Sequence, residues 1–206
     1  MDLAGFSALT EAHGDEAGAD LAQRFAAMTQ AALCDEAEVV DTIGDAVFLV
    51  SETASKMIHA VVRLWEAADA APDFPALRAG LHHGEAVLRD SRWFGTSVNI
   101  AARVAALASG GHVLATSVVA TTARAEGIVA DPLGPMVLKN IRERIEIYSL
   151  GINAQSATAI DPVCRMRGRP ELSAGHLRFG ERDHWFCSLR CAAEFATHPE
   201  AHVDAR

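Results

Sequence analysis

The stretch Val39-Val-Asp-Thr-Ile-Gly-Asp-Ala-Val-Phe-Leu-Val50 decides how the first part of this chain folds. Two apolar, β-branched segments flank the dipeptide Gly44-Asp45, and a two-residue loop between such segments is typical of a tight β-hairpin. The pattern predicts two antiparallel strands with Asp45 held at a rigid tip. A purely structural role is the other interpretation of Asp45, because Asp is common in turns whether or not it binds a metal.

A carboxylate on a rigid hairpin suits a hard cation such as Mg²⁺, provided that a second oxygen ligand arrives from elsewhere. Asp2 is the candidate for that second ligand. Between Asp2 and the hairpin, apolar residues recur at three- and four-residue steps, which predicts an amphipathic helix. The residues of this apolar face are Leu21, Phe25, Met28 and Ala32.

Four motifs follow one another along the chain. They are Asp2-Leu-Ala-Gly-Phe-Ser-Ala-Leu9, Thr42-Ile-Gly-Asp-Ala-Val47, Arg78-Ala-Gly-Leu-His-His-Gly-Glu85 and Phe94-Gly-Thr-Ser-Val-Asn-Ile-Ala-Ala-Arg103. In this order they resemble the catalytic domain of class III nucleotide cyclases, over residues 1–150. The resemblance implies an α/β (α+β) domain of a ferredoxin-like plan, with a mostly antiparallel sheet and packed helices.

The resemblance also implies a reaction, in which ATP or GTP becomes the 3′,5′-cyclic nucleotide and pyrophosphate. Asp2 and Asp45 then bind two Mg²⁺ or Mn²⁺ ions, and a homodimer builds each site. Asn99 and Arg103 project from one helix face, where the amide orients the ribose and the guanidinium meets charge on the α-phosphate. A solvated helix face is the other interpretation of this pair.

Two positions exchange charge relative to adenylate-specific relatives, which carry Lys and Asp where this chain has Asp41 and Arg92. An ionised Asp only accepts and an Arg only donates hydrogen bonds, which suits guanine. Alternatively, Asp41 and Arg92 pair with each other, so the sequence leaves ATP and GTP both open. Lys139 resembles a phosphate-contacting Lys of the family, although a solvated Lys at a strand edge is the more ordinary interpretation.

The start of the chain departs from the family, in which an apolar strand leads into the first metal-binding Asp. Here Met1 directly precedes Asp2. We therefore expect that central strand to be missing, with Asp2 on a frayed terminus and the true start upstream. A catalytically silent, cyclase-like module that binds a nucleotide or a partner is the alternative function.

Composition restricts the partners of this chain of 206 residues. A net charge of −9 argues against nonspecific binding to nucleic acid or to a membrane surface. No apolar run reaches the roughly 18 residues of a membrane span, and no basic-then-apolar leader is present. We expect a cytoplasmic protein without a membrane partner. For His82 and His83 we expect satisfied contacts at a strand end and no catalytic role.

Residues 151–159 are small and polar, which predicts a linker between a first domain at 1–150 and a second at 160–206. The second part holds Cys164, Cys187 and Cys191, whereas Cys34 stands on a predicted helix as a small core residue. Clustered thiols in a reducing compartment are typical of a metal site. Soft thiolates select Zn²⁺, Cu⁺ or similar ions.

The motifs Asp161-Pro-Val-Cys164 and Phe186-Cys-Ser-Leu-Arg-Cys191 resemble the YHS domain, a small metal-associated module. The resemblance implies that Cys164, Cys187 and Cys191 bind a metal. The sequence leaves the fourth ligand open among His176, His184, His198 and solvent. It also leaves open whether the metal only stabilises the small domain or regulates the cyclase.

Overall fold

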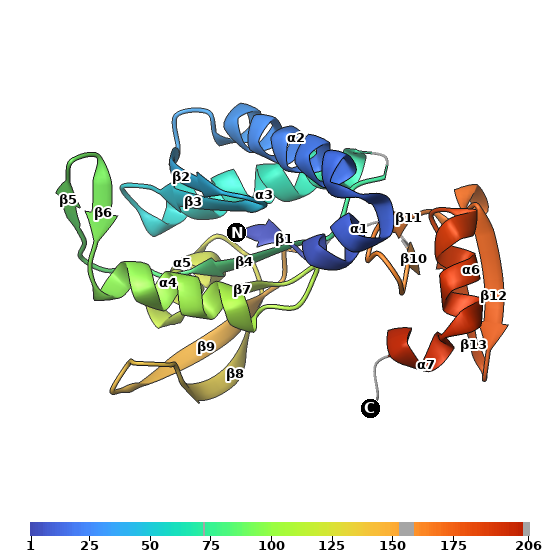
Figure 1. Ribbon diagram of the computed structural model, residues 1–206. Coiled ribbons are helices and arrows are strands. Elements are labelled where there is room, and N and C mark those ends of the chain that lie inside the picture. Colours follow the sequence, from blue (N-terminus) through green and yellow to red (C-terminus); the bar gives the residue numbers. More distant parts are fainter. Residues whose placement is uncertain (72, 153–158, 204–206) are drawn as a thin grey trace.

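The computed structural model describes the chain of 206 residues except 72, 153–158 and 204–206. A seven-stranded sheet with helices on both faces forms its larger part (Figure 1). The elements of this part are β1 (Asp2–Leu3), α1 (Phe6–His13), α2 (Asp15–Leu33), β2 (Glu38–Ile43), β3 (Ala46–Val50), α3 (Ala54–Ala70), β4 (Leu77–Leu81), β5 (Val87–Arg89), β6 (Arg92–Phe94), α4 (Thr96–Leu107), β7 (Val113–Thr116), α5 (Ser117–Ala125), β8 (Ala130–Val137) and β9 (Arg144–Leu150).

The strand order is β2-β3-β1-β4-β7-β9-β8. Only the β4–β7 pair is parallel among the pairs of this sheet, so the expected mostly antiparallel sheet is confirmed. The first four strands and the helices between them follow the β-α-β-β-α-β order of a ferredoxin-like fold. The hairpin prediction is also confirmed, because β2 and β3 are antiparallel and Gly44 turns at φ +60°.

Two apolar layers enclose the sheet. The larger core lies between the sheet and helices α2, α3 and α5, and it includes Leu21 and Phe25 of the predicted amphipathic face. A smaller core lies on the opposite face under α4, around Ile100 and Val104. Figure 1 shows α2 above the short strand β1 and α4 below it. Helices α2, α3 and α5 therefore pack on one face of the sheet, and α4 packs on the other.

The expectation that Asp2 lies on a frayed terminus is wrong, although only Met1 stands where the family has an apolar strand leading into this Asp. Asp2 and Leu3 form a short strand that pairs with β3 on one side and with β4 on the other. The backbone of Met1 extends this pairing, since the amide of Val47 donates to its carbonyl at 2.9 Å. Two residues suffice because both neighbours are present and Leu3 is buried in the core, so Asp2 is tied down rather than frayed.

Cys34 also differs from its prediction. It ends α2 with φ +47° and is exposed, so it is a helix-terminal residue and not a core residue. The predicted linker at 151–159 lies largely outside the described residues, although Ile152 is buried in the main core. Among the described residues, no helix is long and apolar enough to cross a membrane.

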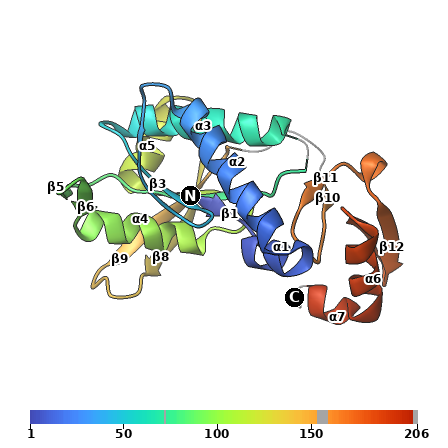
Figure 2. The same ribbon diagram turned by 45° about the horizontal axis from the view of Figure 1, so that its top comes forward.

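The C-terminal part is small and has its own apolar cluster around Phe186 and Phe195. It lies beside α1 in both views of the molecule (Figures 1 and 2). Its elements are β10 (Ala159–Ile160), β11 (Arg167–Gly168), the 3₁₀ helix η1 (Pro170–Leu172), β12 (Gly175–Phe179), β13 (Arg182–Phe186), α6 (Leu189–Thr197) and α7 (Pro199–His202).

Candidate active site and metal centre

The pairing of β1 with β3 brings the two predicted metal-binding carboxylates together. Asp2 lies opposite Ala46, the residue that follows Asp45 in the chain. The electrostatic coupling of the two carboxylates reflects this proximity, because the charge of Asp2 helps to raise the pKa of Asp45. The main cause of that raised pKa is burial, and backbone hydrogen bonds at Asp45 and Leu3 act in the opposite direction.

The carboxylate of Asp2 faces the side of the sheet that α4 covers. Leu3 is buried in the larger core, and side chains alternate along a strand, so Asp2 points to the other face. Arg78 lies on the same face of β4, between the core residues Leu77 and Ala79. Its guanidinium forms an ion pair with Asp2, its direct cross-strand neighbour. This carboxylate therefore has a positive partner.

The helix α4 carries Asn99 and Arg103, which are both exposed. They stand four residues apart and therefore share one side of the helix. The helix approaches β4 closely at Gly80, where a Cβ atom would lie 2.0 Å from the backbone nitrogen of Ala105. Only a glycine permits this approach, so the Arg78-Ala-Gly motif places one residue beside Asp2 and also fixes the position of α4.

The remaining predicted site residues, Asp41, Arg92 and Lys139, are exposed. Asp41 stands at a bulge of β2, and its Oδ1 accepts a hydrogen bond from the amide of Thr42 at 2.9 Å. Arg92 begins β6, on a hairpin that projects from the body of the molecule (Figure 1). Across the described part of the chain, no ion pair joins Asp41 to Arg92. Lys139 lies between β8 and β9.

His82 has the satisfied contact that its strand-end position predicts. Its Nδ1 lies 2.9 Å from Oγ1 of Thr116, at the end of the neighbouring strand β7. Burial lowers the pKa of His82, and the charge of His83 acts in the same direction. His82 is therefore a structural residue at the end of β4.

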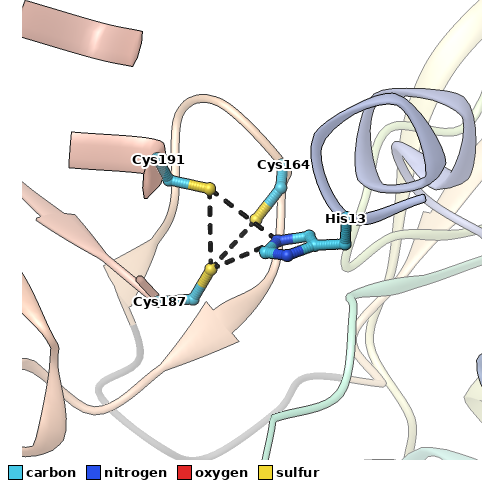
Figure 3. Close-up of side chains that lie close together, drawn as sticks. All are labelled: His13, Cys164, Cys187 and Cys191. Atoms are coloured by element: carbon cyan, nitrogen blue, oxygen red, sulfur yellow. Dashed lines mark hydrogen bonds between the residues drawn. The ribbon is translucent and has the colours of Figure 1, made fainter. Parts of the chain in front are cut away.

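The three cysteines of the C-terminal part gather around one histidine (Figure 3). The Sγ–Sγ distances are 3.3 Å for Cys164–Cys187 and 3.8 Å for Cys187–Cys191. Nε2 of His13 lies 3.6 Å from Sγ of Cys187 and 3.7 Å from Sγ of Cys191. All four donor atoms lie within 4.8 Å of one another. The sequence did not identify His13, which ends α1 and lies 174 residues before Cys187.

The three histidines that the sequence offered as the fourth ligand have other contacts. His176 pairs with Asp183 at 2.9 Å, and His198 lies 3.5 Å from Glu194. His184 packs its ring against Phe195, with centroids 4.8 Å apart. Sequence reasoning missed His13 because neither spacing nor motif links it to the cysteines.

Asp161 is a second residue whose role sequence reasoning missed. It is 2% exposed, and its carboxylate accepts hydrogen bonds from the amides of Val163, Cys164 and Cys187. It thereby joins the two loops that carry these cysteines. The place of Asp161 three residues before Cys164 was a usable signal, because an Asp before a turn commonly accepts bonds from the following amides.

The two sites fit different cations. Asp2 and Asp45 offer carboxylate oxygens, the ligands that Mg²⁺ and Mn²⁺ prefer, and the repulsion between them favours a cation. The cysteine cluster offers soft sulfur and imidazole nitrogen. Burial raises the pKa of Cys191 to about 11, and a hydrogen bond with Cys164 lowers that of Cys187. Two of the three thiols are buried, and a thiophilic ion would supply the positive charge that stabilises their deprotonated form.

Residues 1–151 match the family described as the adenylate and guanylate cyclase catalytic domain. With the ferredoxin-like fold and the paired carboxylates, this match places the chain in that family. The chain is 35% identical over 151 residues to the pH-sensitive adenylate cyclase MT1302 of Mycobacterium tuberculosis, covering 71% of this chain and 38% of that protein. It is also 32% identical over 114 residues to an adenylate cyclase of Streptomyces griseus, covering 55% of this chain and 29% of that protein. The chain thus spans less than half the length of these curated relatives.

Solved structures share the fold. A Trypanosoma brucei adenylate cyclase, described in its monomeric state, superposes with a TM-score of 0.68 at 18% identity, covering 81% of this chain and 89% of that chain. The guanylate cyclase domain of RhGC from Catenaria anguillulae, solved with GTP, superposes with a TM-score of 0.56 at 18% identity, covering 72% and 91% of the two chains. At these identities the likeness concerns the fold alone.

Proposed function

We propose that this chain is a nucleotidyl cyclase, which converts ATP or GTP to the 3′,5′-cyclic nucleotide and pyrophosphate. The observation that carries the proposal is the pairing of β1 with β3, which sets Asp2 beside the hairpin that bears Asp45. Curated relatives named adenylate cyclase support the activity. We place the reaction in the cytoplasm, where nucleoside triphosphates are abundant, and we propose no nucleic-acid or membrane partner.

In this proposal Asp2 and Asp45 hold the cations, and Asn99 and Arg103 act on the substrate. Bound there, two divalent cations would neutralise the triphosphate and lower the pKa of the ribose 3′-hydroxyl. The amide of Asn99 orients the ribose, so that the 3′-oxygen attacks the α-phosphorus and pyrophosphate leaves. The guanidinium of Arg103 stabilises the negative charge that grows on the α-phosphate, and Lys139 contacts the other phosphates.

The proposal requires a homodimer, in which Asn99 and Arg103 of one protomer face the carboxylates of its partner. The exposed apolar residues of the β5–β6 hairpin support it, because Val87, Leu88 and Phe94 are 53–56% exposed. This hairpin projects from the body of the molecule beside α4, as an arm that a second copy would cover (Figure 1).

Asp41 and Arg92 select the base in this proposal. Both are exposed and neither neutralises the other within one chain, so both remain available to a nucleotide. Their chemistry favours guanine, which offers donors at N1 and N2 and an acceptor at O6. The names of the curated relatives favour ATP instead, so the comparison of the two substrates is part of the test.

We further propose the domain division that the sequence predicts, with the cyclase domain at 1–150, a linker at 151–159 and a YHS-like metal module at 160–206. The apolar cluster around Phe186 and Phe195 supports a separate module. Cys164, Cys187 and Cys191 bind a thiophilic metal in this proposal, and their separations support it.

A silent cyclase-like module is the second candidate function, and one observation favours it. The Arg78–Asp2 ion pair already neutralises one of the two carboxylates. A metal cation must therefore either bind Asp2 together with Arg78 or displace Arg78 from it. A chain in which this ion pair persists would bind a nucleotide or a partner without turning it over.

The formation of cyclic nucleotide from ATP and from GTP, with Mg²⁺ and with Mn²⁺, tests the proposal. We expect product with at least one substrate, and no product above background from Asp45→Asn. A folded wild-type chain that binds nucleotide but forms no product with either metal would support the silent module instead.

A further inference from the structure

The helix α1 ends at His13, whose imidazole meets three cysteines that lie more than 150 residues later in the chain. We propose that His13, Cys164, Cys187 and Cys191 bind one thiophilic divalent cation of the Zn²⁺ class. This ion would join the C-terminal module to the cyclase domain. The fourth ligand thus comes from outside the module, which makes the site an interdomain link.

The distances fit a tetrahedral ion. With Zn–S near 2.3 Å and Zn–N near 2.0 Å, neighbouring donor atoms of a tetrahedron lie about 3.5–3.8 Å apart. Four of the six separations between donor atoms run from 3.3 to 3.8 Å, and all six lie within 4.8 Å. They are far longer than the S–S bond of a disulfide, which is about 2.05 Å. Four donors of the S₃N type in this arrangement suit Zn²⁺ better than a hard cation.

The surroundings of the cluster are built for a permanent ion. Cys164 and Cys191 are at most 1% exposed and Cys187 is partly exposed, so water has little access to two of the three thiols. Asp161 fixes the loops of Cys164 and Cys187 through their amides. Cys191 lies in the first turn of α6, where the hydroxyl of Ser188 caps its amide and the helix dipole favours a thiolate.

The module contacts both ends of α1. At the far end Ala12 packs against the apolar cluster of the module, beside His13. At the near end the side chain of Arg165 covers Gly5, where an added Cβ atom would lie 2.4 Å from it. Since Arg165 directly follows the ligand Cys164, one loop of the module contacts both the start and the end of this helix.

This link has a consequence for catalysis, which rests on the proposed function. Only Leu3, Ala4 and Gly5 separate Asp2 from α1. The ion therefore fixes the helix that follows a catalytic carboxylate, and its removal would loosen Asp2. We expect the ion to raise turnover without taking part in the chemistry.

Metal binding by the full chain tests the link without any use of nucleotide. Wild type, His13→Ala, Cys191→Ser and the control His198→Ala would be loaded with Co²⁺ and titrated with Zn²⁺ against a chelator. We expect one tetrahedral Co²⁺ per wild-type chain, with a sulfur-to-metal absorption band. His13→Ala should keep this band but bind Zn²⁺ at least about 100-fold more weakly. This loss of affinity exceeds the roughly 10- to 100-fold loss that is usual for a residue that only hydrogen-bonds a metal ligand.

Cys191→Ser and His198→Ala serve as the positive and negative controls for this metal-binding measurement. Cys191→Ser should lose about a third of the sulfur-to-metal intensity, because one thiolate of three is gone. His198→Ala lies in the same module outside the cluster and should match wild type. An unchanged Zn²⁺ affinity in His13→Ala, with the fold retained by circular dichroism, would overturn the proposal. So would a wild-type chain that binds no ion or isolates with a Cys164–Cys187 disulfide.

Amide hydrogen exchange in α1 provides the second readout. Zn²⁺ should slow exchange at residues 6–13 in wild type and in His198→Ala, but not in His13→Ala. A cyclase assay on the same samples then separates the two proposals. Protection of α1 without cyclic nucleotide from any sample would contradict the function and leave the link standing, whereas turnover that is indifferent to Zn²⁺ would contradict the coupling.

Discussion

The carboxylate pair and the cysteine cluster are two sites of opposite character in one chain. Asp2 and Asp45 are brought together by the pairing of neighbouring strands, and these half-buried carboxylates offer hard oxygen donors. The cluster joins soft donors from α1 and from the C-terminal module, and two of its cysteines are buried. An open site suits ions and substrates that exchange, whereas a closed one suits an ion that remains bound.

The difference shows how each site depends on the rest of the fold. The carboxylates need only the sheet, so changes in the module should reach them weakly and through α1. The cluster needs the docking of two separate parts, so any change that loosens the docking should weaken it. Substitutions in each region can therefore break one site and spare the other.

Arg103→Ala is expected to have the largest effect, and only on turnover. In the proposed mechanism the guanidinium of Arg103 stabilises charge on the α-phosphate, so its loss should lower kcat by roughly 100- to 1,000-fold with little change in KM. Steady-state kinetics measure this. Zn²⁺ binding to the cysteine cluster should stay at the wild-type level, and an Arg103→Ala enzyme with an unchanged kcat would remove Arg103 from the site.

Arg167→Ala is expected to have the next largest effect, and on the docking of the module. Arg167 pairs with Asp69 at the end of α3, with side chains 11% and 16% exposed, and it also donates to the carbonyl of Ala68. Loss of one partner of a buried pair should lower the free energy of unfolding by about 3 kcal/mol.

Chemical denaturation of Arg167→Ala measures that loss. The exposed pair Lys56–Glu52 provides the matched control, because Lys56→Ala should leave the midpoint almost unchanged. Equal effects of the two variants would contradict the buried docking contact.

Gly80→Ala should affect the catalytic face and spare the module. The new methyl group meets the backbone of α4 at Ala105, so the helix must move, at about 1–3 kcal/mol of stability. Displacement of Asn99 and Arg103 should lower turnover by up to roughly 100-fold. Denaturation and kinetics measure both effects. Gly168→Ala, where a Cβ atom meets nothing within 4 Å, is the control and should behave as wild type.

The smallest expected effect is on the pH dependence of stability at His82. Burial lowers the pKa of His82 in the folded chain below the ordinary value of 6.5. The unfolded chain therefore binds more protons as the pH falls, and the free energy of unfolding decreases from pH 6.5 down to the lowered pKa. His82→Gln should flatten this decrease in denaturation curves between pH 7 and pH 5. If the free energy of unfolding of His82→Gln falls with pH as steeply as that of wild type, the lowered pKa of His82 is refuted.

The hairpin and the helix around Phe25 were predictable from local sequence pattern, whereas the ferredoxin-like sheet was implied by the resemblance to the cyclase family. The strand at Asp2 was not. Two residues carry too little pattern to identify a strand, and only the presence of β3 and β4 on both sides makes it one. The exposure of Cys34 depends in the same way on how α2 ends.

The residues of the candidate sites also differ in whether local sequence could identify them. Asp2, Asp45, Asn99 and Arg103 stand in motifs that local sequence displays. His13 stands in none, because its place beside Cys187 and Cys191 arises only when the module docks on α1. Arg78 lies within a motif, yet its ion pair with Asp2 required the register of β1 and β4.

The measurement that tests the account most directly is cyclase activity in a mixture of two inactive variants. Asp45→Asn and Arg103→Ala each lack one half of the proposed two-protomer site. In a mixed dimer one site carries both defects and the other carries none, so random pairing should restore about a quarter of wild-type activity. Recovery in the mixture, with neither variant active alone, is the predicted result. A fully exchanged mixture that stays inactive, beside an active wild type, would contradict a catalytic site shared between two copies of this chain.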